Sequence, residues 1–203
     1  MSWTEALLDC VFPEVCGACG AVGRAPLCRV CEDATLDAAP VKVDGFERVE
    51  ARFEYGGPVA LVIQALKFED RPELGRPLGR WVAPRFNEEN VDLVVPMPST
   101  PNRLRVRGYN PAREIARAFG RVRLDVLERI GEPEPQVALS WEMRKTNPEG
   151  TFRARSRCVA HKRILVVDDV LTTGATLRAA GRALLDGGAA AVLGAVVART
   201  PGR

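Results

Sequence analysis

The sequence predicts an α/β protein with a mostly parallel sheet, helices on both faces and a small N-terminal unit at one end. Short runs of consecutive apolar residues are typical of strands that are buried on both faces, and they alternate with helical patterns along the chain. Four cysteines also lie close together near the N-terminus. We expect strands near 91–95, 164–168 and 190–198, in an order that the sequence leaves open.

The composition is that of a single soluble globular protein, because 46% of the 203 residues are hydrophobic and 27% are charged. No apolar run approaches the roughly 20 residues that span a bilayer, and the N-terminus lacks the features of a signal sequence. We therefore expect a cytoplasmic protein without membrane insertion. The expected units are a helix and cysteine-rich unit over 1–40, a segment over 41–90 and a core over 91–203.

Positive charge is concentrated in the middle of the chain. The net charge is only +3, but residues 101–163 contain 15 Lys or Arg against 7 Asp or Glu. Anionic small substrates or DNA would both explain this excess. A solvated helix face explains several of these arginines equally well.

Cys16, Cys19, Cys28 and Cys31 form two Cys-x-x-Cys pairs separated by eight residues. Four thiolates in this spacing can surround one Zn²⁺ tetrahedrally and leave no open position, which favours a structural role over a catalytic one. Disulfides are disfavoured in a protein that is not exported. A thioredoxin-type redox site would need a single pair at a strand-to-helix turn.

The segment that follows predicts a strand and two helices. Residues 46–55 alternate as an amphipathic strand does, and Gly56-Gly57-Pro58 ends the pattern. Residues 59–68 return to a helical spacing, with Lys67 near the end, where a cation complements the helix dipole. A second helix is expected over 72–83.

A polar turn follows the next buried strand at once, with the sequence Pro96-Met97-Pro98-Ser99-Thr100. The end of a parallel strand is where α/β sheets collect their ligands. Arg103, Arg105 and Arg107 then alternate and are suited to bind a polyanion, or to decorate an exposed strand edge. A helix is expected over 111–121.

Residues 164–176 carry the main chemical signal. Four apolar residues are followed by Asp168 and Asp169, a Thr/Gly loop and a helical pattern over 175–185. The free N–H groups at a helix N-terminus can hold a phosphate. Adjacent acids would repel that phosphate unless they bind ribose hydroxyls or a cation. An ordinary acidic N-cap is the alternative, but the pattern favours a site for a ribose phosphate.

Residues 166–176, Val-Val-Asp-Asp-Val-Leu-Thr-Thr-Gly-Ala-Thr, resemble the phosphoribosyl-pyrophosphate (PRPP) loop of type I phosphoribosyltransferases. Nearly the whole chain resembles the ComF/GntX family, which are competence-associated phosphoribosyltransferase-like proteins with an N-terminal zinc ribbon. The other matching motifs, in the family order, are Cys16-x-x-Cys19, Cys28-x-x-Cys31, Ala65-Leu-Lys67-Phe68, Pro96-Met-Pro98, Arg107-Gly-Tyr-Asn110, Gln136, Arg144-x-x-Asn147 and Gly150-Thr-Phe152.

This resemblance implies a type I phosphoribosyltransferase-like fold, a structural Zn²⁺ in the ribbon and Mg²⁺ bound with PRPP. It implies that Asp168 and Asp169 are the catalytic pair and hold the ribose hydroxyls, and that residues 103–107 can close as a lid. The implied PRPP-binding residues are Val170, Leu171, Thr172, Thr173, Gly174, Ala175 and Thr176. The implied pyrophosphate and Mg²⁺ side is formed by Met97, Pro98, Ser99, Arg105 and Arg107.

The chain departs from the family pattern at two places. Glu69-Asp70 stands shortly after the Lys-aromatic pair, where members usually have a glycine. Ser99-Thr100 stands where a Leu-His pair is common. Because His161 is the only histidine in the chain, a histidine general base is not expected.

The resemblance implies a PRPP-binding protein that acts in DNA uptake and natural transformation or in nucleotide metabolism, with phosphoribosyl transfer as an open question. The alternatives are a non-catalytic ligand-sensing or DNA-binding scaffold, with single-stranded DNA or DNA-uptake proteins as partners, and a nucleobase salvage transferase. The acid pair favours ribose binding, whereas the ribbon favours a macromolecular partner. The acceptor is expected under a hood formed by the ribbon and residues 46–80, in which no base-reading pattern is identified.

Overall fold

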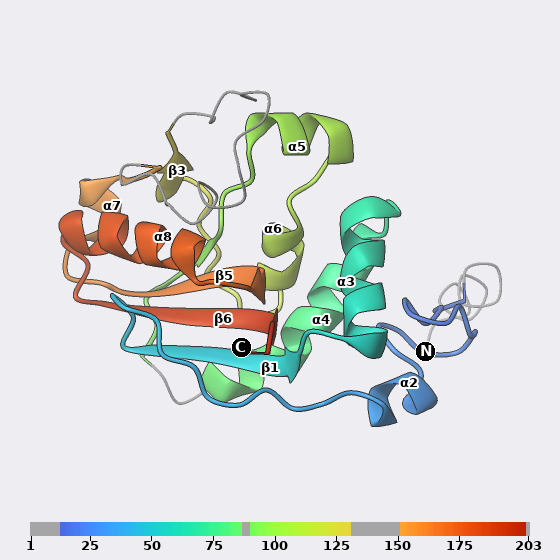
Figure 1. The fold of residues 1–203 in the computed structure, drawn as a ribbon. Helices are drawn as coiled ribbons and strands as arrows, with labels where there is room; N and C mark the ends of the chain where they lie inside the picture. Colours follow the sequence, from blue (N-terminus) through green and yellow to red (C-terminus); the bar gives the residue numbers. More distant parts are fainter. Residues whose placement is uncertain (1–12, 87–89, 131–150, 202–203) are drawn as a thin grey trace, which may run out of the picture.

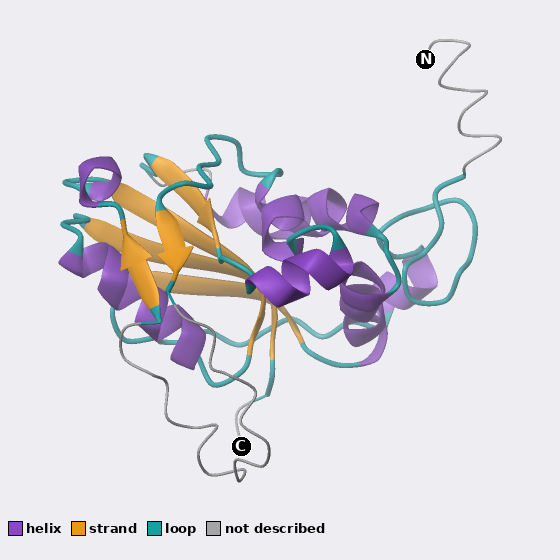
Figure 2. Cartoon of the chain, turned by 90° about the horizontal axis from the view of Figure 1, so that it is seen from above, coloured by secondary structure: helices purple, strands orange, loops and turns teal. Residues whose placement is uncertain are grey.

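A computed structural model describes residues 13–86, 90–130 and 151–201. It contains a parallel sheet in the order β1-β6-β5-β2, covered by helices on both faces (Figures 1 and 2). The predicted α/β class and the three predicted strands are confirmed. The strands are β1 (Arg48–Glu54), β2 (Leu93–Pro96), β5 (Arg163–Leu171) and β6 (Ala191–Arg199).

β5 lies in the interior of the sheet, between β2 and β6. All four side chains from Ile164 to Val167 are at most 1% exposed, as expected for a strand buried on both faces. Its pairing with β6 continues as far as Leu171, which is opposite Arg199. Asp168 and Asp169 therefore belong to the last part of the strand, and the loop begins only at Thr172.

The two faces of the sheet have separate apolar cores. Leu165 and Val167 contribute to the core that includes α3 (Gly57–Phe68), α4 (Gly75–Val82) and α6 (Pro111–Ala116). Ile164 and Val166 point to the opposite core, as alternate residues of a strand must. That core includes α8 (Ala175–Asp186) and the antiparallel pair of β3 (Leu127–Arg129) and β4 (Phe152–Ala154).

The remaining elements are short, and two of them refine the predicted helix bounds. The helix expected over 72–83 consists of the 3₁₀ turn η1 (Pro72–Leu74) and α4, followed by η2 (Ala83–Phe86). α6 ends at Ala116 instead of residue 121: the chain continues in tight turns, in which the Ala118 and Phe119 N–H groups donate to the Ile115 and Ala116 carbonyls, and Gly120 and Arg121 then adopt left-handed backbone angles. The others are α2 (Arg29–Asp33), α5 (Pro101–Arg107) and α7 (Ser156–Val159).

Residues 103–107 are helical, so the alternative of a charged strand edge is wrong. Thr100 caps this helix, α5, by accepting a hydrogen bond from the Arg103 backbone N–H at 3.2 Å, and proline occupies its first turn. Gly108, with φ +79°, ends it in the left-handed conformation that favours glycine. These cap signals determine the structure in spite of the alternating arginines.

The cysteine-rich unit packs at one end of the sheet, beside α3 (Figure 1). Leu27 is fully buried in the same core as α3, and the Arg71 guanidinium donates a hydrogen bond to the Val15 carbonyl at 3.1 Å. None of the helices in the described ranges is long and apolar enough to cross a membrane. Gln136, Arg144, Asn147 and Gly150 lie outside the described residues.

Candidate functional site

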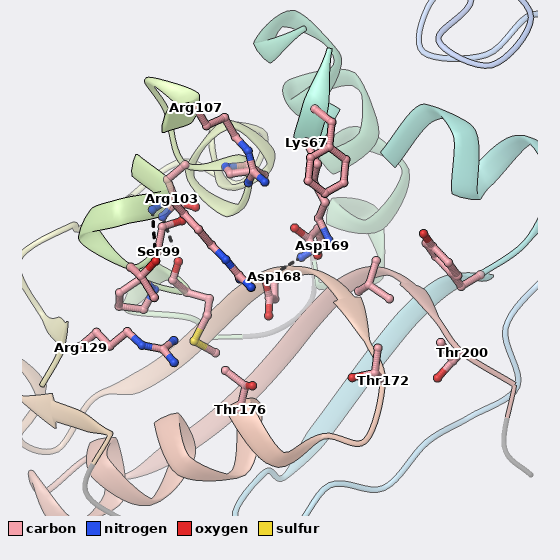
Figure 3. Close-up of a pocket in the computed structure, with 18 residues that line it drawn as sticks. Lys67, Ser99, Arg103, Arg107, Arg129, Asp168, Asp169, Thr172, Thr176 and Thr200 are labelled. Carbon is pink, nitrogen blue, oxygen red and sulfur yellow. Dashed lines mark hydrogen bonds and ion pairs between the residues drawn. The ribbon is translucent and has the colours of Figure 1, made fainter. Parts of the chain in front are cut away.

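A cavity of about 570 Å³ opens at the carboxyl ends of β2 and β5, where parallel sheets collect ligands (Figure 3). One side is formed by the end of β5 and the loop before α8, and the other by the turn after β2 and by α5. It brings together most of the predicted site residues. The lining includes Met97, Pro98, Ser99, Arg107, Asp168, Asp169, Val170, Thr172 and Thr176 from the predicted set, together with Tyr55, Lys67, Phe68, Thr100, Arg103, Asn110, Pro111, Arg129 and Thr200.

Asp168 and Asp169 lie at the centre of this cavity. The Asp169 backbone N–H donates to Asp168 Oδ1 at 2.9 Å, and Lys67 Nζ lies 2.6 Å from Asp169 Oδ1. Burial, together with the charge of Asp169, raises the pKa of Asp168 from 3.8 to about 7, although Lys67 and Arg103 act in the opposite direction. Asp169 is therefore held in an ion pair with Lys67, whereas ionisation of Asp168 costs free energy.

The loop after β5 joins the strand to α8 through a glycine in the left-handed conformation. Gly174 adopts φ +74° and ψ 0° as the N-cap of α8. The Thr173 hydroxyl accepts a hydrogen bond from the Ala175 backbone N–H at 3.3 Å. The Thr172 and Thr176 side chains are exposed and line the cavity, whereas Leu171 is buried in the core behind it. The loop thus presents the Thr172 and Thr176 side chains to the cavity, beside the N-terminus of the twelve-residue helix α8.

The facing wall is held in place by backbone pairing. Met97 continues the register of β2 by donating its backbone N–H to the Val167 carbonyl at 2.8 Å. The Asn110 side-chain amide donates to the Met97 carbonyl at 2.9 Å, and its carbonyl oxygen caps α6 by accepting from the Ala112 N–H. One asparagine thus ties the turn after β2 to the start of α6.

α5 distributes its arginines between two cavities. Residues four apart share a helix face, so Arg103 and Arg107 both reach the cavity at the acids, while Arg105 does not. Arg105 instead lines a neighbouring cavity between α5 and the end of α3. None of the three arginines forms an ion pair with another residue in the described ranges. The walls of both cavities therefore have positive charge available to anions.

Lys67 and Arg129 also line the cavity, although neither is among the site residues predicted from the sequence. Lys67 does have a signal, since it belongs to the Ala65-Leu-Lys67-Phe68 motif, but its partner Asp169 is known only from the packing of α3. Arg129 comes from β3, and its guanidinium stacks 5.3 Å from the centre of the Phe152 ring. No pattern in the sequence distinguishes it from the other arginines of the basic middle.

The four N-terminal cysteines form a compact cluster. Their Sγ atoms all lie within 4.8 Å of one another, and all four are free thiols. The Cys19 and Cys28 sulfurs are 3.7 Å apart, which excludes a disulfide bond between them. A tetrahedral Zn²⁺ with Zn–S bonds of about 2.3 Å would place its sulfur ligands about 3.8 Å apart. The cluster therefore fits a tetrahedral metal ion.

The thiols of the cluster also differ in their readiness to ionise. Burial acts to raise the pKa of Cys16, but backbone hydrogen bonds from Cys19 and Cys28 outweigh it and lower the value to about 6. Burial and the neighbouring sulfurs raise the pKa of Cys31 to about 12. One thiolate suppresses ionisation of another unless a cation lies between them, so a bound divalent metal would allow all four to be thiolates.

Comparison with known proteins places the chain in a family. The sequence model of the phosphoribosyl transferase domain matches residues 67–203, about two thirds of the chain. The chain therefore belongs to the phosphoribosyl transferase domain family. This agrees with the observed parallel sheet and with the resemblance seen in the loop after β5.

Its relatives include proteins named for competence and DNA utilization, as the ComF/GntX resemblance predicts. The chain is 28% identical over 198 residues to the DNA utilization protein YhgH of Escherichia coli K12, covering 88% of this chain and 87% of that protein. It is 32% identical over 139 residues to the competence protein ComFC of Streptococcus pneumoniae, covering 68% and 62%. The competence protein F of Haemophilus influenzae is 29% identical over 138 residues, covering 61% and 60%.

Two solved structures are similar at a lower level. An allosteric regulatory enzyme of purine biosynthesis aligns with a TM-score of 0.41 at 23% identity, over 60% of this chain and 24% of that enzyme. The protein TT1426 of Thermus thermophilus aligns with a TM-score of 0.35 at 19% identity, over 62% of this chain and 83% of that one.

Proposed function

We propose that the cavity at the ends of β2 and β5 binds PRPP together with Mg²⁺, and that the protein acts in the handling of DNA taken up by the cell. The observation that carries the ligand assignment is the joining of an acid pair, a helix N-terminal loop and two arginines around one cavity. The link to DNA uptake is supported by the names of its relatives, which include DNA utilization and competence proteins.

In this proposal each part of the PRPP molecule has its own group of side chains. Asp168 and Asp169 accept hydrogen bonds from the two ribose hydroxyls. The Thr172–Thr176 loop donates backbone and hydroxyl hydrogen bonds to the sugar phosphate, with the dipole of α8 behind them. Gly174 suits this role because it lacks a side chain and tolerates the left-handed conformation it adopts.

The turn after β2 and the arginines of α5 form the pyrophosphate side. Met97, Pro98 and Ser99 approach the ligand with their backbone, while Arg103 and Arg107 balance the charge of the leaving pyrophosphate. The carboxylate oxygens of the acid pair are hard donors of the kind that Mg²⁺ prefers, so the site fits this ion. When bound, Mg²⁺ neutralises the charge that develops on the pyrophosphate oxygens.

We also propose that the four clustered cysteines hold a structural Zn²⁺ and that residues 1–40 form one unit with it. The sulfur spacing supports a tetrahedral site without an open position. Because Cys16 and Leu27 extend into the core beside α3, the metal would also stabilise the helix that carries Lys67.

Calorimetric titration of the zinc-loaded protein with PRPP and Mg²⁺ tests the ligand assignment. We expect saturable binding, and we expect the variant with Asp168→Asn and Asp169→Asn to lose it while it keeps its fold. The matched control is Asp44→Asn with Asp186→Asn, which removes the same charge from exposed positions outside the cavity. Binding that survives in the first variant would refute the role of the acid pair.

A non-catalytic sensor of PRPP is the second candidate, because the Lys67–Asp169 ion pair would have to rearrange when a ribose binds and can report occupancy to α3. Release of pyrophosphate on addition of an acceptor distinguishes the two. Turnover supports a transferase, whereas tight binding without pyrophosphate release under any acceptor supports a sensor.

A further inference from the structure

Three cationic side chains that line the ligand cavity lie on one side of the acid pair. Lys67 from α3 lies there with Arg103 and Arg107 from α5, whereas Thr172 and Thr176 lie on the other side (Figure 3). In the proposed function, the threonine side holds the sugar phosphate and the arginine side holds the pyrophosphate. Lys67 therefore lies on the pyrophosphate side of the cavity.

The partner of Lys67 in the free protein is nevertheless one of the acids assigned to the ribose. Lys67 Nζ lies 2.6 Å from Asp169 Oδ1, and the two side chains are only 24% and 14% exposed. Attraction between two charges is stronger where water is partly excluded. A ribose hydroxyl that donates to the Asp169 carboxylate must therefore compete with the lysine ammonium group.

The backbone that carries Lys67 is fixed, whereas its side chain can move. Ala65 and Leu66, just before it, are buried, and the Tyr109 hydroxyl donates a hydrogen bond to the Leu66 carbonyl at 2.5 Å. A lysine ammonium group is carried by a flexible four-carbon stem and has three donors. Lys67 can therefore exchange one anionic partner for another by changing its rotamer, without movement of α3.

The positive charge around Lys67 favours an anion on this side of the cavity. The Arg107 guanidinium lies 5.3 Å from the centre of the ring of Phe68, the residue that follows Lys67. Arg103 and Arg107 form no ion pair with another described residue. Neighbouring cations repel one another unless an anion lies between them. A pyrophosphate group has several negative charges, so it would attract Lys67 more strongly than the single charge of Asp169 does.

We propose that Lys67 is an exchangeable counter-ion, which pairs with Asp169 in the free protein and moves to the pyrophosphate group when PRPP binds. This inference rests on the proposed function, and it assigns to Lys67 the choice between two ligands of the same site. When PRPP binds, the ribose displaces the ammonium group and the pyrophosphate receives it. Ribose 5-phosphate also displaces the ammonium group but brings no pyrophosphate to receive it. Lys67 thus selects PRPP over ribose 5-phosphate.

Calorimetric titrations with PRPP and with ribose 5-phosphate, both with Mg²⁺, test this selectivity. Lys67→Met should weaken PRPP binding by roughly 10- to 100-fold, the range expected for loss of one hydrogen bond between charged groups. The same variant should bind ribose 5-phosphate at least as tightly as the unmodified protein, because the competitor of the ribose is gone. A merely structural role would weaken both ligands alike. Lys42→Met, at an exposed position outside the cavity, is the control.

Titration with pyrophosphate and Mg²⁺ tests the exchange itself. Asp169→Asn releases Lys67 before the ligand arrives, so pyrophosphate should bind more tightly to this variant than to the unmodified protein. Asp168→Asn is the matched control, because it removes a negative charge without releasing Lys67. The comparison is made at pH 8, above the raised pKa of Asp168 of about 7. The extra gain of Asp169→Asn over Asp168→Asn should disappear when Lys67→Met is added.

A preference for PRPP that Lys67→Met leaves unchanged, or an extra gain in Asp169→Asn that persists without Lys67, overturns the proposal. Titration of the unmodified protein with PRPP decides the proposed function separately. Lys67-dependent binding of pyrophosphate without binding of PRPP would keep the exchange and remove the proposed function. PRPP binding with a selectivity that does not depend on Lys67 would do the reverse.

Discussion

Asp168 shows at the scale of one residue how the site affects stability. Its pKa is raised from 3.8 to about 7, first by burial and then by the charge of Asp169. Between these two pH values the folded protein retains a proton that the unfolded chain has released, so stability falls as pH rises through this window. This loss of stability, which comes from ionising Asp168 in the folded protein, is absent below about pH 4 and fully present above about pH 7.

Asp168→Asn removes the free-energy cost of ionising this buried carboxyl group. The substitution should therefore stabilise the folded protein instead of destabilising it. We expect the variant to exceed the unmodified protein in unfolding free energy by about 1–2 kcal/mol at pH 8, a value discounted because the side chain is partly exposed. The difference should disappear near pH 4. Urea unfolding at both pH values measures it, with Asp44→Asn as the control for loss of a carboxylate. An equal difference at both pH values would contradict the assigned cause.

At the scale of elements, two glycines allow α4 to approach α6 closely. A Cβ atom on Gly75 would lie 2.4 Å from the Glu114 Cβ, and one on Gly79 would lie 2.2 Å from the Ile115 carbonyl oxygen. Both distances are shorter than any real contact, so these positions require glycine for packing. α6 in turn is capped by Asn110, which also holds the turn after β2.

Gly79→Ala should therefore destabilise the protein by about 1–3 kcal/mol, as overpacked cores do, although alanine is the better helix former by about 1 kcal/mol. Thermal unfolding measures the change. Gly56→Ala is the matched control, since its φ of 175° is ordinary extended backbone and nothing lies near its Cβ position. An unchanged midpoint for Gly79→Ala would mean that α4 moves away from α6 freely.

At the scale of the whole molecule, the cysteine cluster is connected to the ligand site through the core. Removing zinc with a chelator, or by Cys19→Ser, should lower the thermal midpoint and weaken PRPP binding, because α3 carries Lys67. Elemental analysis should find one zinc per chain in the unmodified protein and in Cys158→Ser, the control at a cysteine outside the cluster. Full stability without metal would show that the ribbon is held by its apolar contacts alone.

The sequence predicts those structural features that depend on residues adjacent to one another along the chain. Residues 164–167 are all apolar and predict a buried strand, and the loop after them is recognisable because its residues are consecutive. The alternating arginines of 103–107 suggest an extended segment, but the cap at Thr100 determines a helix. The Lys67–Asp169 ion pair and the Phe68–Arg107 contact depend on the packing of α3 against the sheet and against α5, which no local pattern contains.

The sheet order also has a consequence for biosynthesis. β1 is the first strand of the sheet to be translated, yet its partner in the sheet is β6, and Arg48 is opposite Leu193 about 145 positions later. Closing so long a loop costs entropy before any contact repays it, and contacts of such separation slow folding. During translation, β1 therefore keeps an unpaired edge next to α3 and α4 until almost all of the described chain has left the ribosome.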